Sequence, residues 1–183
     1  MVLTKPGICN FGWKAPDFTL KGVDDKSYSL ADVRGPKGTV VVFICNHCPY
    51  VRAVISRIVD EAKALHSIGI GTIAINSNDA ASYPEDSFEN MKSFATKHNF
   101  GFPYVIDETQ DIARAYDALC TPDFFGLDAK DQLQYRGRLD ASRTSLVPTA
   151  RRELYEAMMQ VAETGQGPRE QIPSMGCSIK WKV

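Results

Sequence analysis

The chain has 183 residues, and its 21 lysine and arginine residues nearly balance 22 aspartate and glutamate residues, which leaves a net charge of −1. A chain of this length suits one domain, residues 1–183, which buries about 70% of its unfolded surface and needs no disulfides to hold its core together. The balanced charge predicts no basic surface for nucleic acid or for an anionic membrane. We therefore expect neither of these partners.

The cysteine count and the start of the chain indicate the cellular setting. Residues 1–7 contain no basic region followed by an apolar run, and no segment approaches the ~20 apolar residues that span a bilayer. Five cysteines are an odd number in a chain this long, which argues against the disulfide framework of a small secreted protein. We expect a reducing, cytoplasmic setting in which the thiols are free for chemistry.

An N-terminal extension, residues 1–37, precedes the first long apolar run. Residues 15–20 and 27–30 flank a turn at 22–25, and this pattern predicts a β-hairpin. Residues 38–44 are then continuously apolar and β-branched, which is typical of a strand buried on both faces. We expect the hairpin to lie along one edge of the sheet that contains this strand.

A helix and a second strand follow the buried strand. From Pro49 the apolar residues repeat at helical spacing as far as Leu65, and Gly69 ends the run. Residues 70–75 form the next apolar strand. The order strand, helix, strand predicts two parallel strands joined by a helical crossover.

The second half continues with short elements and closes with an extended tail. Asp86 is the predicted N-cap of a helix, with Glu89 as its capping-box partner. Strands at 123–127 and 133–139 have a short connection and predict an antiparallel hairpin, with Arg138 on its polar side together with Asp140. The other predicted elements are a helix at 88–98, a strand at 102–106, helices at 112–119 and 147–163, and a tail at 165–183. Together they predict an α/β fold with a central mixed sheet flanked by helices.

The most informative motif is Cys45-Asn46-His47-Cys48, between the first buried strand and the helix that starts at Pro49. Proline is tolerated at the first helical position, so Cys48 becomes the N-cap and points its sulfur at unpaired backbone N–H groups. Such a position favours a thiolate. We therefore expect Cys48 to attack a substrate and Cys45 to resolve the intermediate; if Cys45 caps the helix instead, the roles are exchanged.

Residues near the cysteine pair are expected to shape the site. His47 either adds positive charge beside the thiols or is an exposed loop imidazole. Thr121-Pro122 enters a strand and is a candidate cis peptide bond, which would present a backbone edge to the extended chain of a substrate. We expect His47, Pro49, Thr121 and Pro122 to bind substrate or shape the site.

Two further cysteines are candidate accessory thiols. Cys120 is either a third redox thiol or a small buried residue. Cys177 lies in the tail, where apolar and polar residues alternate, and it either packs on the domain or swings toward Cys48. We predict that some of the oxidised protein carries a disulfide involving Cys177, which requires Cα atoms within about 7 Å.

These motifs together resemble the thioredoxin-fold superfamily and, within it, the peroxiredoxin-like branch of the alkyl hydroperoxide reductase/thiol-specific antioxidant group. The motifs that carry the resemblance are APDF at 15–18, CNHCPYV at 45–51, SND at 77–79, YP at 83–84, TPDFF at 121–125, YRGR at 135–138 and GCSIKWK at 176–182. The resemblance implies a thioredoxin-like fold and a redox-active cysteine pair. It implies no organic cofactor, and it points to a thioredoxin or glutaredoxin-type electron donor.

The sequence departs from the peroxidase pattern PxxxTxxC of that group. Val41 occupies the proline position and Cys45 the threonine position, so the hydroxyl that holds a peroxide is missing. No arginine occurs from residue 115 to residue 135, where these peroxidases carry one that activates the thiolate. The departures favour disulfide exchange over peroxide reduction.

Three functions remain in competition. The first is a thiol-disulfide oxidoreductase acting on a disulfide substrate. The second is a thiol peroxidase, in which a hydroperoxide converts Cys48 to a sulfenic acid that Cys45 then condenses with. The third is a zinc- or copper-binding module using Cys45, His47 and Cys48, with Cys120 or Cys177 as a further ligand; because no second ligand pair is visible, we expect no metal in the site.

Overall fold

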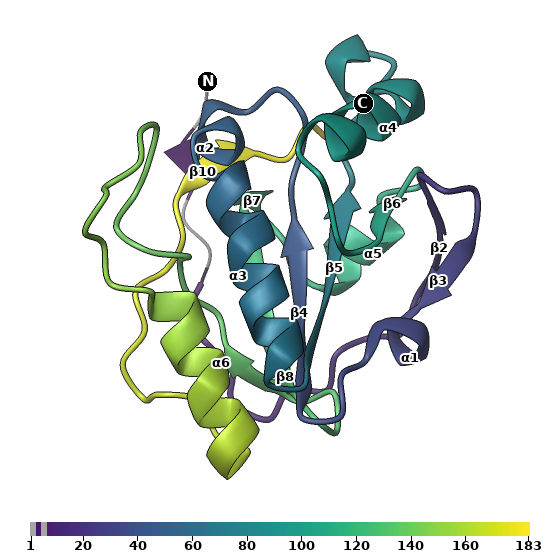
Figure 1. Ribbon diagram of the computed structural model, residues 1–183. Coiled ribbons are helices and arrows are strands. Elements are labelled where there is room, and N and C mark those ends of the chain that lie inside the picture. Colours follow the sequence, from purple (N-terminus) through teal and green to yellow (C-terminus); the bar gives the residue numbers. More distant parts are fainter. Residues whose placement is uncertain (1–2, 5–6) are drawn as a thin grey trace.

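A computed structural model describes residues 3–4 and 7–183 of the chain (Figure 1). The expectation that the first seven residues contain no targeting segment depends partly on residues 1–2 and 5–6, which lie outside the described residues. Within the described ranges, no helix is both long enough and apolar enough to cross a membrane.

A seven-stranded mixed sheet forms the centre of the molecule. Strands β4, β5 and β6 are parallel, and the other neighbouring strands pair antiparallel, including the predicted hairpins β2–β3 and β8–β9. The strands in sheet order are β3 (Ser27–Ser29), β2 (Thr19–Gly22), β6 (Tyr104–Ile106), β5 (Ile70–Asn76), β4 (Gly38–Phe43), β8 (Asp123–Asp128) and β9 (Leu133–Tyr135). The prediction of a central mixed sheet with an N-terminal hairpin at one edge is confirmed.

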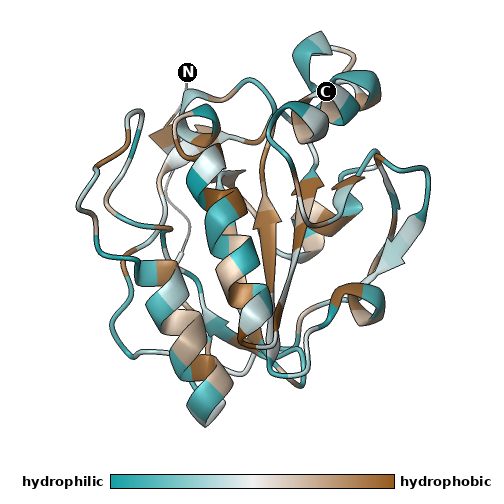
Figure 2. Ribbon diagram, viewed as in Figure 1, coloured by the Kyte–Doolittle hydropathy of each residue, from teal (hydrophilic) through white to brown (hydrophobic). Residues whose placement is uncertain are grey.

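Helices cover both faces of this sheet, and β4 contributes to the apolar core on each face. Val40 and Val42 pack in the core on the face of α3, α4 and α6, whereas Val41 and Phe43 pack in the core on the face of α1 and α5. Figure 2 shows most of the β4 arrow in the brown of hydrophobic residues. The helices are α1 (Leu30–Val33), α2 (Pro49–Arg52), α3 (Ile55–Ser67), the 3₁₀-helix η1 (Pro84–Asp86), α4 (Phe88–Lys97), α5 (Asp111–Ala115) and α6 (Glu153–Thr164).

Three short strands form a second sheet beside the first. They are β1 (Leu3–Thr4), β10 (Gly176–Ser178) and β7 (Cys120–Thr121), with β10 in the middle and both pairings antiparallel. Figure 1 shows β10, from the end of the chain, beside α2. The predicted extended tail is thus present, and it returns to the region of the cysteine pair.

Several predicted boundaries are wrong for local reasons. The helix expected from Pro49 is divided into α2 and α3, because the N–H of Val54 bonds to Val51 O in a tighter turn. The strand expected at 133–139 ends at Tyr135, whose hydroxyl donates to Arg138 O at 2.6 Å as the chain folds back. The helix expected from residue 147 begins only at Glu153.

The predicted polar roles of four residues are also wrong. Ser87, not Asp86, caps α4, because Ser87 Oγ accepts the N–H of Asn90, and Glu89 is therefore not a capping-box partner. Arg138 and Asp140 lie beyond β9, where Arg138 pairs with Glu153 at 2.9 Å and Asp140 pairs with Arg57 at 2.6 Å.

The central strands predict where a side-chain truncation is costly. Ile73 in β5 is fully buried, so Ile73→Ala should lower the free energy of unfolding by about 2–5 kcal/mol in urea titrations followed by circular dichroism. The matched control is Ile172→Ala, whose side chain is 50% exposed and should cost far less. Equal losses in the two variants would contradict this assignment of the core.

Candidate functional site

The two cysteines of the CxxC motif lie where β4 gives way to α2. Cys48 is the N-cap of α2 and Pro49 is its first residue, as predicted. The sulfur of Cys48, however, makes no hydrogen bond to the N–H groups of the helix, so that expected contact is wrong. The sulfur lies instead against Thr121 in strand β7.

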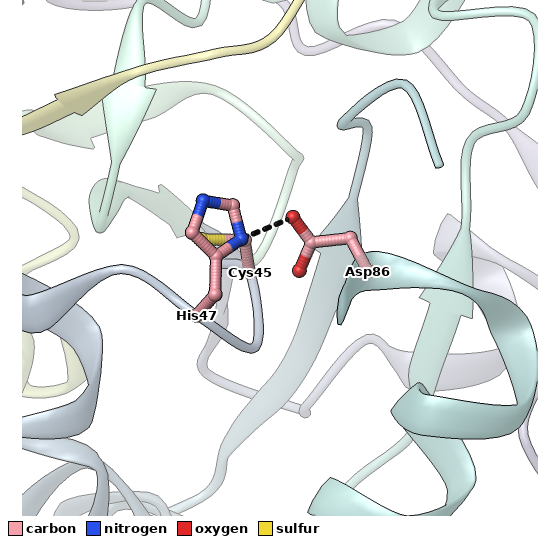
Figure 3. A group of neighbouring side chains, drawn as sticks. All are labelled: Cys45, His47 and Asp86. Atoms are coloured by element: carbon pink, nitrogen blue, oxygen red, sulfur yellow. Dashed lines mark ion pairs between the residues drawn. The ribbon is translucent and has the colours of Figure 1, made fainter. Parts of the chain in front are cut away.

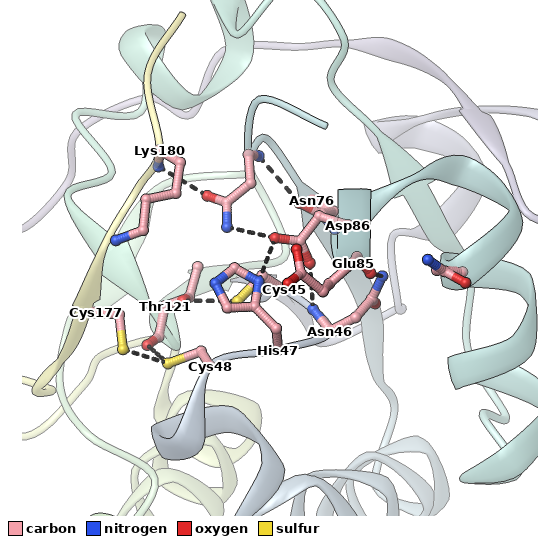
Figure 4. A network of polar contacts seen from close by, with 12 residues as sticks. Cys45, Asn46, His47, Cys48, Asn76, Glu85, Asp86, Thr121, Cys177 and Lys180 are labelled. Carbon is pink, nitrogen blue, oxygen red and sulfur yellow. Dashed lines mark hydrogen bonds and ion pairs between the residues drawn. The ribbon is translucent and has the colours of Figure 1, made fainter. Parts of the chain in front are cut away.

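Both sulfurs converge on Thr121, the residue before Pro122. Cys48 Sγ lies 3.3 Å from Thr121 O, and Cys45 Sγ lies 3.4 Å from Thr121 Oγ1. The Thr121–Pro122 peptide bond is cis, which confirms the sequence prediction. Three of the residues expected to form the site, Cys45, Cys48 and Thr121, are therefore in contact (Figure 4).

The environment separates the acidities of the two thiols. The neighbouring Cys45 thiol first, and then contacts with Cys177 and Thr121, lower the pKa of Cys48 to about 5 against the opposing effect of burial. The pKa of Cys45 is raised well above its usual range, by Cys48 first, then by burial and the charge of Asp86. The arrangement therefore favours a thiolate at Cys48 next to a protonated thiol at Cys45.

His47 faces a buried carboxylate, so it is not the exposed loop imidazole that was one of the two expectations. Its Nδ1 lies 2.7 Å from Asp86 Oδ2, a contact that becomes an ion pair when the imidazole is protonated and that lacks the alignment of a hydrogen bond (Figure 3). The ring is stacked on Tyr83 at a centroid distance of 5.8 Å. Asp86 also accepts the backbone N–H of Asn46 at 2.7 Å and the side-chain amide of Asn78 at 2.9 Å.

One group of donor atoms is compact enough to hold a metal ion. The ligand atoms of Cys45, His47 and Asp86 lie within 4.8 Å of one another, and this is the one such group among the described residues. Cys48, which the sequence placed in the ligand set, is replaced in this group by Asp86. The group offers a sulfur, a nitrogen and an oxygen, which suit zinc or copper, although a structural zinc site has four ligands.

The other cysteines differ sharply in position. Cys177 in β10 is 4% exposed, and its sulfur lies 2.8 Å from that of Cys48. Cys120 is fully buried, its sulfur contacts Pro122 O at 3.6 Å, and burial raises its pKa well above the usual range. Cys9 is half-buried, and burial raises its pKa to about 11. Of the two candidate accessory thiols, the structure brings Cys177 into contact with Cys48.

Sequence reasoning missed the polar residues behind the motif. Tyr104 in β6 donates to Asn46 Oδ1 at 2.7 Å and accepts from Asn76 in β5 at 3.2 Å. Asn76 carried the available signal, because it ends a buried strand and the carboxyl ends of parallel strands meet at one edge of a sheet. Asp86 carried none, since an acidic residue before a helix reads as a surface cap.

The chain belongs to the AhpC/TSA family, whose model matches residues 11–136. Together with the mixed sheet and the thiols at its edge, this membership defines an oxidoreductase of the thiol-based kind with a thioredoxin-like fold.

Three similar proteins give this membership its context. An uncharacterized conserved protein from Geobacillus kaustophilus has a crystal structure with a TM-score of 0.94 and 44% identity, covering 100% of this chain and 97% of that one. The thioredoxin-like protein YneN of Bacillus subtilis is 27% identical over 67% of this chain and 68% of its own length. The thiol-disulfide oxidoreductase ResA of Bacillus subtilis is 25% identical over 62% of this chain and 59% of its own length.

The acidity of Cys48 should depend on a donor at position 45. In wild type, the ultraviolet absorbance of the Cys48 thiolate should titrate with a midpoint near pH 5. Cys45→Ala should raise this midpoint by about 1–2 pH units, because it removes a hydrogen bond to a charged group, which contributes about 1.5–3 kcal/mol. Cys45→Ser keeps a donor and should shift the midpoint less, and Cys48→Ser supplies the baseline. The midpoint is the informative quantity, since a thiolate of higher pKa is rarer but intrinsically more nucleophilic. An unchanged midpoint in Cys45→Ala would contradict the conclusion that the Cys45 thiol lowers the pKa of Cys48.

Proposed function

We propose that the protein is a thiol-disulfide oxidoreductase in which Cys48 attacks and Cys45 resolves. The observation that carries the proposal is the pairing of a low-pKa thiol with a high-pKa thiol across one turn of chain, both against the edge of β7. The name of the relative ResA, a thiol-disulfide oxidoreductase, supports the same chemistry. The assignment of roles is the one expected from the sequence.

The reaction transfers two electrons from the protein dithiol to the substrate. The Cys48 thiolate attacks one sulfur of a substrate disulfide, and the other substrate sulfur leaves as a thiolate that takes up a proton. Cys45 then loses its proton and attacks the sulfur of Cys48, so that the second substrate thiol leaves and a Cys45–Cys48 disulfide remains. A protein dithiol of the thioredoxin or glutaredoxin type restores the reduced form by the reverse exchange, in the cytoplasm that the sequence predicts.

The groups around the thiols have roles that fit this sequence of steps. His47 lies in the same cluster as the Cys45 sulfur and next to Asp86, where its imidazole can accept the proton that Cys45 must lose. Thr121 and Pro122 carry the backbone edge at which a substrate chain would pair in place of β10, and Pro49 is the first residue of α2.

The arginine nearest in sequence to the range in which a peroxidase carries its activating arginine is engaged in other contacts. Arg136, one residue beyond the range that the sequence excluded, donates to Asp117 O at 2.7 Å, lies 3.4 Å from Asp123 and covers the ring of Phe125. These contacts engage the guanidinium away from the thiols. We therefore rank peroxide reduction below disulfide exchange.

A paired kinetic assay tests this ranking. Reduced protein should lose its thiols to glutathione disulfide faster than to hydrogen peroxide at equal concentration. Cys48→Ser should abolish the reaction, Cys45→Ser should keep the first attack, and Cys9→Ser should behave as wild type. Oxidation by peroxide that is faster by orders of magnitude would make the protein a peroxidase. Loss of the first attack in Cys45→Ser alone would exchange the two roles.

The second candidate function is the binding of a zinc or copper ion, and the compact Cys45, His47 and Asp86 group favours it. Against it stands the demand on Asp86, whose two oxygens already accept hydrogen bonds from Asn46 and Asn78. We expect zinc titration of the reduced protein against a chromophoric chelator to show less than one tightly bound ion per chain. Stoichiometric zinc that His47→Ala abolishes and Cys177→Ser retains would place metal binding first.

A further inference from the structure

The tail strand β10 occupies the backbone edge at which a substrate chain would pair. Cys177 is opposite Thr121 and Ser178 is opposite Cys120 in an antiparallel register. A short edge strand next to a reactive sulfur is a suitable place for an extended peptide to add by strand pairing. Here the chain's own tail makes those pairings (Figures 1 and 4).

Gly176 permits this close approach. A Cβ atom at residue 176 would lie 2.0 Å from Thr121 O and 2.6 Å from Thr121 C, and both of these atoms belong to backbone. A side chain at this position would therefore force β10 away from Thr121. The tail is thus matched in shape to the edge beside the thiols.

Contacts beyond β10 hold the tail in this place. Lys180 donates its backbone N–H to Asn78 Oδ1 at 2.9 Å, and its carbonyl accepts from Asp79 N at 2.8 Å and from Gln110 Nε2 at 2.9 Å. With the tail in place, Cys48 and Cys45 are only 0% and 1% exposed. A substrate chain can pair at Thr121 only when β10 has left it.

The fixed tail brings a third sulfur to the reacting atom. The sulfurs of Cys177 and Cys48 are 2.8 Å apart, whereas a disulfide bond is about 2.05 Å long, so less than about 1 Å of movement separates contact from a bond. Of the two sequence expectations for Cys177, packing on the domain is the one observed, and no swing of the tail is needed to reach Cys48. The Cys177 sulfur therefore lies next to Cys48, where the sulfur of a substrate disulfide would have to lie.

We propose that Cys177 is a third redox-active residue and that β10 is an internal substrate strand, which deepens and rests on the disulfide exchange proposed above. When Cys48 carries a mixed disulfide, Cys177 loses its proton and attacks the Cys48 sulfur, and the substrate sulfur leaves as a thiolate that takes up a proton. The Cys45 thiolate then attacks Cys48, which forms the Cys45–Cys48 disulfide and returns Cys177 to a thiol. The first step completes the two-electron reduction of the substrate, and the second only moves the protein disulfide.

The fate of glutathione on Cys48 tests the proposal. The Cys45→Ser variant, treated with glutathione disulfide and then alkylated in acid, should contain a Cys48–Cys177 disulfide and little bound glutathione in non-reducing peptide maps. The double variant Cys45→Ser/Cys177→Ser should keep glutathione on Cys48. The matched control Cys45→Ser/Cys120→Ser should behave as Cys45→Ser does, because Cys120 contacts other partners.

A glycine substitution tests the role of the strand separately. Adding Gly176→Ala to Cys45→Ser should lower the Cys48–Cys177 fraction several-fold and speed the first attack on glutathione disulfide. The control is Gly101→Ala, because residue 101 has open space around its Cβ position. Circular dichroism shows whether each variant is folded, and the cysteine variants decide the proposal if Gly176→Ala is not.

The outcomes separate the two proposals. Glutathione that stays on Cys48 in Cys45→Ser with Cys177 still reduced, while wild type forms the Cys45–Cys48 disulfide, would overturn the role of Cys177 and leave the proposed function standing. A Cys48 that accepts no glutathione in any variant would overturn the proposed function itself.

Discussion

The antiparallel pairing of β4 with β8 is the constraint on which the site depends. Its register places Phe43, the last residue of β4, opposite Asp123, the first residue of β8. The chain that leaves β4 therefore meets the chain that enters β8, and the thiols of residues 45 and 48 lie against Thr121. Because β4 is buried on both faces, a shift of this register by one residue would exchange its two core faces, so the apolar cores also protect the geometry of the site.

The pKa values of Cys45 and Cys48 depend on burial and on the groups around the two sulfurs. A buried thiolate is costly unless nearby groups donate to it, and Cys48 has the Cys45 thiol, Cys177 and Thr121 as neighbours. The same concentration of negative charge, with Asp86 close by, holds the proton on Cys45. The asymmetry of the pair thus follows from mutual interaction, and the single helical turn of α2 contributes its N-cap position without a hydrogen bond to the sulfur.

The small sheet formed by β1, β10 and β7 links the tail to this chemistry. It covers an edge that would otherwise be open next to a reactive sulfur, which is a region where strands of other chains add readily. The contact between Cys177 and Cys48 is therefore part of the packing of the tail, and we propose that it also takes part in disulfide exchange.

Local patterns determined much of this protein. The unbroken apolar run of β4, the helical spacing after Pro49, the position of Cys48 at a helix start and the cis bond before Pro122 all depend on residues near one another in the chain, so they could be predicted from sequence. Only the tertiary structure decided which distant groups join them. Asp86, the Asn46–Tyr104 pair and the 2.8 Å approach of Cys177 arise from strand register and loop closure. Such contacts could not be predicted from the local sequence, because the same residue types at the same spacing also occur as helix caps, surface polar groups or packed side chains.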